Sequence, residues 1–98
     1  MMNNFYLIGK LIEEPEKSQT GSGLPMAKLR ICVDKNGRES EEDNNVFEVT
    51  AFRSIAEMNI PKGAIVVVSG KVQPNNYSKE GTVYYNTRLV ASAVSLIA

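Results

Sequence analysis

Hydrophobic and polar side chains alternate along several stretches of the chain, which is the pattern of a β-strand with one buried face. In residues 46–53, Phe47 begins a wholly apolar row and is predicted to face the core. The opposite row combines Glu48 and Thr50 with a second phenylalanine, Phe52. This stretch therefore predicts a strand that carries an aromatic ring on its solvent-exposed side.

Five stretches predict strands. Some alternate strictly, and others are compact runs of apolar and β-branched residues. Gly70 interrupts one of them and predicts a β-bulge or a barrel corner. The predicted strands are residues 5–12, 26–33, 46–53, 64–73 and 83–97, the last with a candidate break at residues 91–93.

The segments between these strands carry turn and loop signals. Pro15 ends the first strand, because proline cannot donate a hydrogen bond to the ladder. Residues 18–25 are rich in glycine and serine and predict a turn, and residues 34–45 predict an acidic loop. Residues 74–81 predict a hairpin loop with Tyr77 at its tip.

Residues 54–59 predict one or two helical turns, with Ser54 as the N-cap and Glu57 at capping-box spacing. Five strands with one short helix between the third and the fourth predict an all-β, closed or partly closed barrel. The 98 residues predict a single domain, residues 1–98, without an internal repeat.

The composition is that of an ordinary globular chain, with 43% hydrophobic and 22% charged residues. The longest apolar run, residues 64–68, is too short to span a bilayer, and the N-terminus lacks the features of a signal peptide. We therefore expect a cytoplasmic protein without membrane contact. Cys32 is the only cysteine and cannot form an internal disulfide.

Charge is balanced overall, with 11 basic and 11 acidic residues, but it is unevenly distributed. Seven of the 11 acids lie in residues 13–16 and 39–43, which contain no basic residue. This distribution predicts acidic loops set apart from a basic region that could attract a phosphate backbone.

The available side chains restrict the chemistry. The chain has no histidine, which excludes imidazole bases and histidine metal sites, and one thiol cannot build a zinc site. The turn at Gly21 and Gly23 lacks the spacing of a phosphate-binding loop. We therefore expect a binding module without cofactor or metal, and not an enzyme.

Aromatic and basic residues recur at positions that strand alternation leaves exposed. Aromatic rings can stack on nucleobases of any identity, while lysine and arginine follow the phosphates, so the combination is typical of a groove for a single nucleic-acid strand. The alternative is that the rings plug the barrel or form a subunit contact. The residues concerned are Phe52 with Arg53, Tyr77, Tyr84 with Arg88, and Lys28 with Arg30.

The order of short motifs resembles the bacterial single-stranded DNA-binding protein family over nearly the whole chain. The opening strand leads from Asn4 to a Glu-Pro-Glu exit at residue 16, and a turn at Gly23 follows. Further matching motifs are Phe52-x-x-Ile-Ala-Glu57, Lys62-Gly63 before a valine-rich strand, Gly70-Lys-Val72, and Tyr77 followed by Gly81.

The resemblance implies a five-stranded OB-fold Greek-key barrel that binds single-stranded DNA in replication, recombination or repair. It implies a homodimer or homotetramer, with replication or recombination proteins as further partners. Carried over to this chain, it places Phe52 and Tyr77 at positions where bases stack. Lys10 and Lys71, which lie in the matching motifs, complete the set of predicted DNA-binding residues.

The chain also departs from the family pattern. Another stacking position falls on Val46 and a further one near Gly37, neither of which carries a ring. Positions that are usually basic hold Phe5, Glu48 and Gln73. These departures imply weaker binding or a shorter site. The acidic tail through which typical members recruit partners does not lie within these 98 residues, so the resemblance implies either a tail-less member or a piece of a longer protein.

Two other functions remain open. The chain also resembles the primosomal replication protein N family in the turn at residues 22–25, which implies an adaptor with weak DNA binding. A structural or inhibitory barrel, with Phe52 and Tyr77 buried by a partner subunit, is the third possibility. Residues 5–12 predict an apolar edge strand that favours pairing between subunits, and RNA is an alternative ligand.

Overall fold

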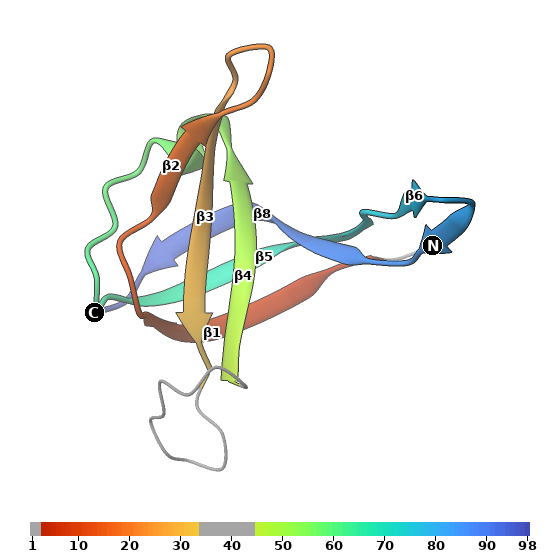
Figure 1. Ribbon diagram of the computed structural model, residues 1–98. Coiled ribbons are helices and arrows are strands. Elements are labelled where there is room, and N and C mark those ends of the chain that lie inside the picture. The colour runs from red at the N-terminus through yellow and green to blue at the C-terminus, as the bar shows by residue number, and fades with distance from the viewer. Residues whose placement is uncertain (1–2, 34–44) are drawn as a thin grey trace.

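A five-stranded β-barrel forms the body of the computed structural model, which describes residues 3–33 and 45–98 (Figure 1). The strands run around the barrel in the order β1-β5-β8-β4-β3, and a further pairing of β1 with β3 closes it. The contact between β4 and β8 is parallel, and the others are antiparallel. This arrangement confirms the predicted barrel. Its strands are β1 (Phe5–Leu11), β3 (Pro25–Cys32), β4 (Val46–Phe52), β5 (Ile65–Pro74) and β8 (Thr87–Leu96).

The core lies inside the barrel and is built from the apolar rows of these strands. Burial of aliphatic side chains supplies most of the driving force for closing such a barrel. The prediction that Phe47 faces the core is wrong, because this side chain is 43% exposed. It lies one residue from the start of β4, at the rim of the barrel, where few neighbours surround it. The largest fully buried side chains are Leu11, Leu29, Ile31, Val49, Val66 and Val68.

Two short strands were not predicted, the first at residues 16–19 and the second at residues 77–79, within the predicted hairpin loop. Residues 16–19 form β2 (Glu16–Gln19), which pairs with β3 and places Glu16 opposite Lys28. All four residues of β2 are exposed, so this strand has no buried face and leaves no hydrophobic alternation in the sequence. It is held by backbone pairing instead.

The predicted last strand, residues 83–97, is divided between two strands, β7 and β8. β6 (Tyr77–Lys79) and β7 (Thr82–Tyr84) form a ribbon that projects from the barrel (Figure 1), and β8 starts afresh at Thr87. Glu80 and Gly81 form the tip with positive φ angles of 53° and 77°, so Tyr77 is not at the tip. The predicted break at residues 91–93 is a bulge, because Gly70 pairs with Ala91 while Ser69 pairs with Ala93.

The helix is shorter than predicted and begins earlier. α1 (Arg53–Ala56) follows Phe52, which caps it without a side-chain hydrogen bond. The prediction that Ser54 is the N-cap of a capping box with Glu57 is therefore wrong, because Ser54 already lies inside the helix. Within residues 3–33 and 45–98, no helix is long and apolar enough to cross a membrane. The predicted acidic loop and Gly37 lie mostly outside the described residues.

Gly70 is required where three strands approach one another. A Cβ atom at this position would overlap the carbonyl oxygen of Val90 in β8 and would lie 2.8 Å from the ring of Phe5 in β1. The first of these neighbours is backbone and cannot rotate away. The bulge opposite Gly70 and the close packing of β1, β5 and β8 thus depend on the missing side chain.

We expect Gly70→Ala to lower the free energy of unfolding by about 1–3 kcal/mol, because the added methyl group must displace backbone. Gly21→Ala is the matched control, since a Cβ atom there would meet no heavy atom within 4 Å. The control should change stability by less than about 0.5 kcal/mol. Urea unfolding followed by circular dichroism measures both, and equal midpoints for the two variants would contradict the role of Gly70.

Candidate nucleic-acid interface

The outer face of β3 and β4 forms one wall of a shallow groove. The register pairs Met26 with Phe52, Lys28 with Thr50 and Arg30 with Glu48, so these side chains lie on the same outward face. The start of β8 borders the face on the other side. The groove has a volume of about 380 Å³ and is lined by Met26, Lys28, Glu48, Thr50, Arg88 and the segment around Asn75 and Asn86.

Phe52 lies on the outward side of β4, as predicted, but its ring is half-buried. The guanidinium carbon of Arg88 lies 5.6 Å from the centre of the ring, at cation–π distance. Arg88 Nη2 donates a hydrogen bond of 3.4 Å to Gln73 Oε1, whereas its buried Nε has no partner among the described residues. The planar guanidinium therefore covers a ring on which another planar group could stack.

The ribbon carries two tyrosines that stack on each other. The ring centres of Tyr77 and Tyr84 are 5.1 Å apart at an angle of 16°, and the residues are 54% and 45% exposed. The two rings protect one face of each other and leave the remaining faces at the surface. The ribbon is thus an exposed aromatic arm beside the groove.

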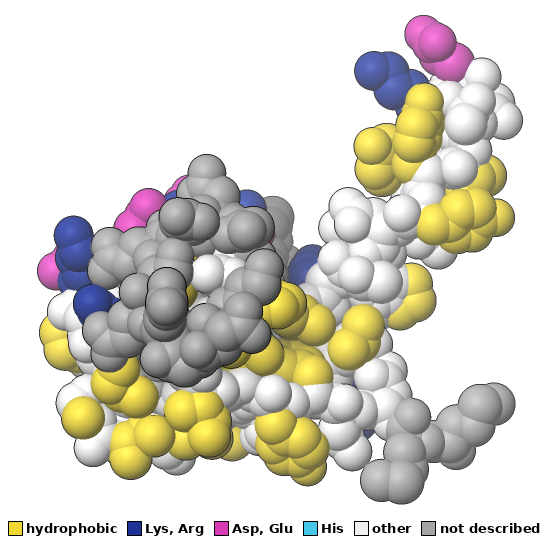
Figure 2. Space-filling view, turned by 90° about the horizontal axis from the view of Figure 1, so that it is seen from below, with side chains coloured by type: hydrophobic (Ala, Val, Ile, Leu, Met, Phe, Trp, Pro, Cys, Tyr) yellow, Lys and Arg dark blue, Asp and Glu magenta, His cyan; other side chains and the backbone are white. Residues whose placement is uncertain are grey.

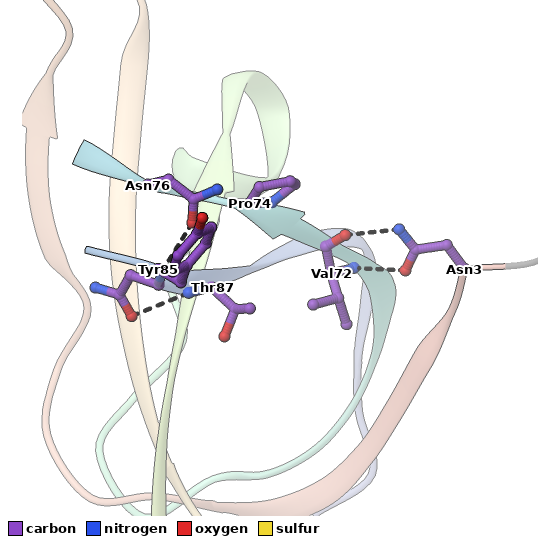
Figure 3. Close-up of a pocket in the computed structure, with 7 residues that line it drawn as sticks. Asn3, Val72, Pro74, Asn76, Tyr85 and Thr87 are labelled. Atoms are coloured by element: carbon purple, nitrogen blue, oxygen red, sulfur yellow. Dashed lines mark hydrogen bonds between the residues drawn. The ribbon is translucent and has the colours of Figure 1, made fainter. Parts of the chain in front are cut away.

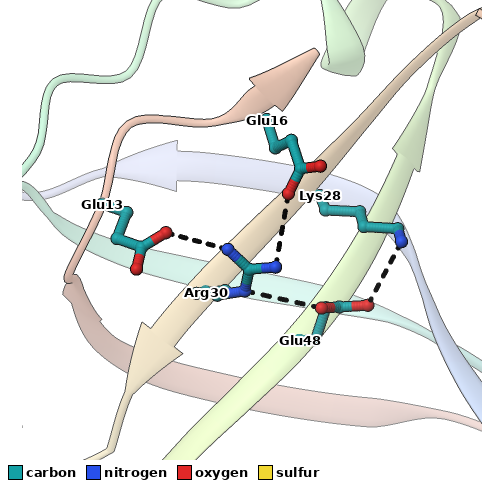
Figure 4. A network of polar contacts seen from close by, with 5 residues as sticks. All are labelled: Glu13, Glu16, Lys28, Arg30 and Glu48. Atoms are coloured by element: carbon teal, nitrogen blue, oxygen red, sulfur yellow. Dashed lines mark hydrogen bonds and ion pairs between the residues drawn. The ribbon is translucent and has the colours of Figure 1, made fainter. Parts of the chain in front are cut away.

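Lys28 and Arg30 are engaged by carboxylates (Figure 4). Arg30 Nη1 lies 2.8 Å from Glu13 Oε2, and Arg30 Nη2 lies 3.2 Å from Glu16 Oε2. Arg30 Nε lies 3.5 Å from Glu48 Oε2, and Glu48 Oε1 lies 3.9 Å from Lys28 Nζ. The hydrogen bond that Arg30 donates to Glu13, together with the charges of the three carboxylates, raises the pKa of Arg30.

This network corrects the predicted segregation of charge. Glu13 and Glu16 do not form a separate acidic surface, because the exit of β1 and the pairing of β2 with β3 bring both onto Arg30. The other acidic segment, residues 39–43, lies outside the described residues. The outer face of β3 and β4 therefore carries mixed charge.

The remaining predicted site residues are dispersed. Lys71 is exposed on β5 and shares a face with Gln73, which contacts Arg88. Arg53 is exposed at the start of α1 with a positive φ of 58°. Lys10 lies on β1, outside the groove, so the barrel does not bring it to the other candidates.

Sequence reasoning overlooked Tyr85. It is 84% exposed, more than any other large hydrophobic side chain in the described chain. If residues 83–97 formed one continuous strand, alternation would place Tyr85 on the same face as Leu89. The structure instead has a break between β7 and β8, and Tyr85 lies in that break. Two adjacent tyrosines with a polar Asn-Thr pair behind them were the available signal of such a break.

Comparison with known proteins links these features to one family. Residues 2–97 match the model of the single-strand binding protein family. The single-stranded DNA-binding protein of Aquifex aeolicus is 30% identical over 105 residues, which cover 99% of this chain and 71% of that protein. Single-stranded DNA-binding protein 1 of Staphylococcus aureus is 29% identical over 103 residues, which cover 99% of this chain and 66% of that protein.

A solved structure shares the fold. A deletion mutant of the single-stranded DNA binding protein from Thermus aquaticus superimposes with a TM-score of 0.78 at 20% identity, over 99% of this chain and 51% of that one. The chain spans about two thirds of the length of the curated relatives and about half of this structure. The two proteins therefore share the barrel although their sequences are only 20% identical.

We expect Arg30→Gln to lower the thermal midpoint at low salt, because it leaves Glu13, Glu16 and Glu48 without their common cation. Lys28→Gln, which removes a single ion pair of 3.9 Å, is the matched control and should have a smaller effect. Salt screens exposed charges, so the difference between the variants should shrink at high ionic strength. Calorimetry at two salt concentrations tests this, and an unchanged difference would contradict it.

Proposed function

Because this chain belongs to the single-strand binding protein family, we propose that it binds single-stranded DNA with little preference for base sequence. The observation that carries this proposal is the position of the covered ring of Phe52 beside an arginine at the edge of the groove. A ring that stacks bases and a cation that holds phosphates are the two components that sequence-tolerant binding of a single strand needs.

In the proposed complex a base replaces the Arg88 guanidinium on Phe52. The exchange is feasible because a cation–π contact is worth about 0.5–2 kcal/mol, no more than the about 1–3 kcal/mol of a stacked base, and the freed guanidinium gains a phosphate. The released guanidinium can then bind a phosphate next to the stacked base. Its Nε, which has no partner among the described residues, gains an acceptor in this arrangement.

The tyrosine ribbon and the exposed cations extend this site. Tyr77 and Tyr84 offer the outer faces of a stacked pair to further bases. Arg53 at the end of β4 and Lys71 on β5 are exposed cations that can follow the backbone. Lys10 remains a separate candidate, because it would need a strand that wraps to the β1 side of the barrel.

The carboxylate network limits the affinity of the proposed site. Lys28 and Arg30 can contact a phosphate only in competition with Glu48 and, for Arg30, with Glu13 and Glu16. Since the salt dependence of binding follows the number of phosphates neutralised, both the affinity and its slope against salt should be modest. The proposed activity is binding without a covalent step, in the service of DNA replication, recombination or repair.

We expect Phe52→Ala to weaken binding of an oligothymidine of about 30 nucleotides at least about fivefold, through the loss of one stacking ring. Phe47→Ala removes a ring from the opposite row of the same strand and is the matched control. Fluorescence anisotropy at low and moderate salt measures both, with a duplex of equal length for comparison.

Several outcomes would contradict the proposed function. Equal binding of single strand and duplex would reject the preference for a single strand. Monomerisation of Phe52→Ala with intact DNA binding would reject the stacking role and favour a ring buried between subunits. The absence of DNA binding by the unchanged protein would favour the adaptor function with a protein partner.

We further propose that the protein forms a homo-oligomer through β1. Tyr6 and Ile8 are 73% and 61% exposed, and hydrophobic side chains gather on the side of the molecule where β1 lies (Figure 2). The pairing of β1 with β3 involves only Lys10 and Leu11, so no described strand covers that edge of residues 5–8. An apolar edge strand of this kind can pair with its own copy around a two-fold axis.

We expect Ile8→Lys to shift the protein toward monomer, because a charged side chain in the middle of the edge opposes pairing. Val83→Lys is the control, since Val83 is similarly exposed at 51% but lies on the ribbon. Light scattering after size-exclusion chromatography measures the mass. An oligomer of unchanged mass in Ile8→Lys would exclude β1 as the interface.

A further inference from the structure

A second depression lies at the root of the ribbon, apart from the groove on β3 and β4. Its volume is about 600 Å³, and it is open to solvent. Val72 and Pro74 of β5 form its apolar wall, and Tyr85 and Thr87 line it as well (Figure 3). Its lining among the described residues contains no charged side chain, in contrast to that of the groove.

Tyr85 is the most notable part of this lining. Phe52 is covered by Arg88, and Tyr77 is stacked on Tyr84. No ring or cation contact is found for Tyr85 within the described chain, and its side chain is 84% exposed. An aromatic ring at the edge of a neutral, concave surface can accept a flat ligand without displacing another group.

Three asparagines hold the depression in shape. Asn3 pairs with the backbone of Val72, donating from Nδ2 to the carbonyl oxygen at 2.6 Å and accepting from the amide at 3.0 Å. Asn76 Oδ1 accepts from the amide of Asn86, and Asn86 Oδ1 accepts from the amide of Thr87, both at 2.9 Å. These bonds fix the amide orientations, so a ligand meets a largely preorganised surface.

The same bonds leave donors available. In the described part of the chain, the Nδ2 groups of Asn76 and Asn86 make no hydrogen bond. Every nucleobase carries acceptor atoms on its edges, so such donors can bind a base without selecting its identity. A phosphate would be bound more strongly beside a positive charge, which the described lining lacks.

We propose that this depression is a second nucleobase subsite, in which a base stacks on Tyr85 while Asn76 or Asn86 donates a hydrogen bond to its edge. This subsite rests on the proposed function, because its ligand is a base of the same bound strand. It adds Tyr85 and two asparagines to the residues that contact DNA.

The position of the subsite predicts how a strand reaches it. Asn86 and Thr87 line both the depression and the groove, so the start of β8 separates the two. A strand that leaves Phe52 must pass around this edge before a base can reach Tyr85. An oligonucleotide of about three nucleotides, below the about 4–16 that one OB-fold covers, therefore fills the groove alone, and only longer ones contact both sites.

The test compares oligothymidines of about three and about 30 nucleotides by fluorescence anisotropy, since one OB-fold covers about 4–16 nucleotides and the short one lies below that range. We expect Tyr85→Ala to bind the long oligonucleotide at least about fivefold more weakly and the short one as the unchanged protein does. Phe52→Ala should weaken both. Tyr85→Phe keeps the ring and should retain the affinity for both lengths.

A second readout uses tyrosine fluorescence, which no tryptophan obscures in this chain. The long oligonucleotide should quench more tyrosine emission than the short one, and Tyr85→Phe should reduce that difference while affinity is kept, the remaining quenching being that of Tyr77 and Tyr84. This result would place a base on Tyr85 even if the alanine variant were less stable.

The outcomes separate the subsite from the proposed function. Unchanged affinity of Tyr85→Ala for the long oligonucleotide, or equal weakening at both lengths, would overturn the subsite while the function stands. A change in oligomeric mass in Tyr85→Ala would assign the ring to a contact between copies and also overturn it. Failure of the unchanged protein to bind either length would reject the proposed function itself.

Discussion

Closure of the barrel depends on β1, which must pair with β5 along most of its length and with β3 at its end. Two glycines permit the close approach of strands in this barrel, Gly9 between β1 and β3 and Gly70 between β5 and β8. A side chain at Gly9 would overlap the carbonyl oxygen of Cys32, and one at Gly70 would overlap that of Val90. The register of every strand follows from this closure, and with it the choice of side chains that face outward. The groove exists because a closed barrel leaves one row of each strand outside.

The same register explains why the outer face is not simply basic. Strand pairing brings Glu48 beside Arg30 and Glu16 opposite Lys28, so carboxylates and cations of different segments meet on one surface. Exposed ion pairs of this kind contribute little to stability, but they compete with any anion for the same cations. In the proposed function, this mixed face favours binding in which stacking on aromatic rings supplies the preference for a single strand, and charge contributes a smaller part of the affinity.

Alternation in the sequence could predict the barrel because its core rows repeat every second residue in β3 and β4. It could not predict β2, which buries no side chain, nor the exposure of Phe47, which depends on its place at the rim. Phe52 was placed on the correct side, but its contact with Arg88 joins residues far apart in the chain and leaves no local pattern. Tyr85 was missed for a related reason, since its exposure follows from a strand break that alternation passes over.

The free protein keeps several of the proposed binding rings covered. Arg88 lies over Phe52, and Tyr84 lies on Tyr77, which reduces the apolar surface that a separate barrel would expose. A base that stacks on Phe52 must replace the existing contact, so the net gain is smaller than stacking on a bare ring would give. Tyr85 has no such cover among the described residues, so a base that stacks on it in the proposed subsite displaces no existing ring or cation contact. Different rings of one barrel can therefore contribute unequally to affinity even when their chemistry is nearly the same.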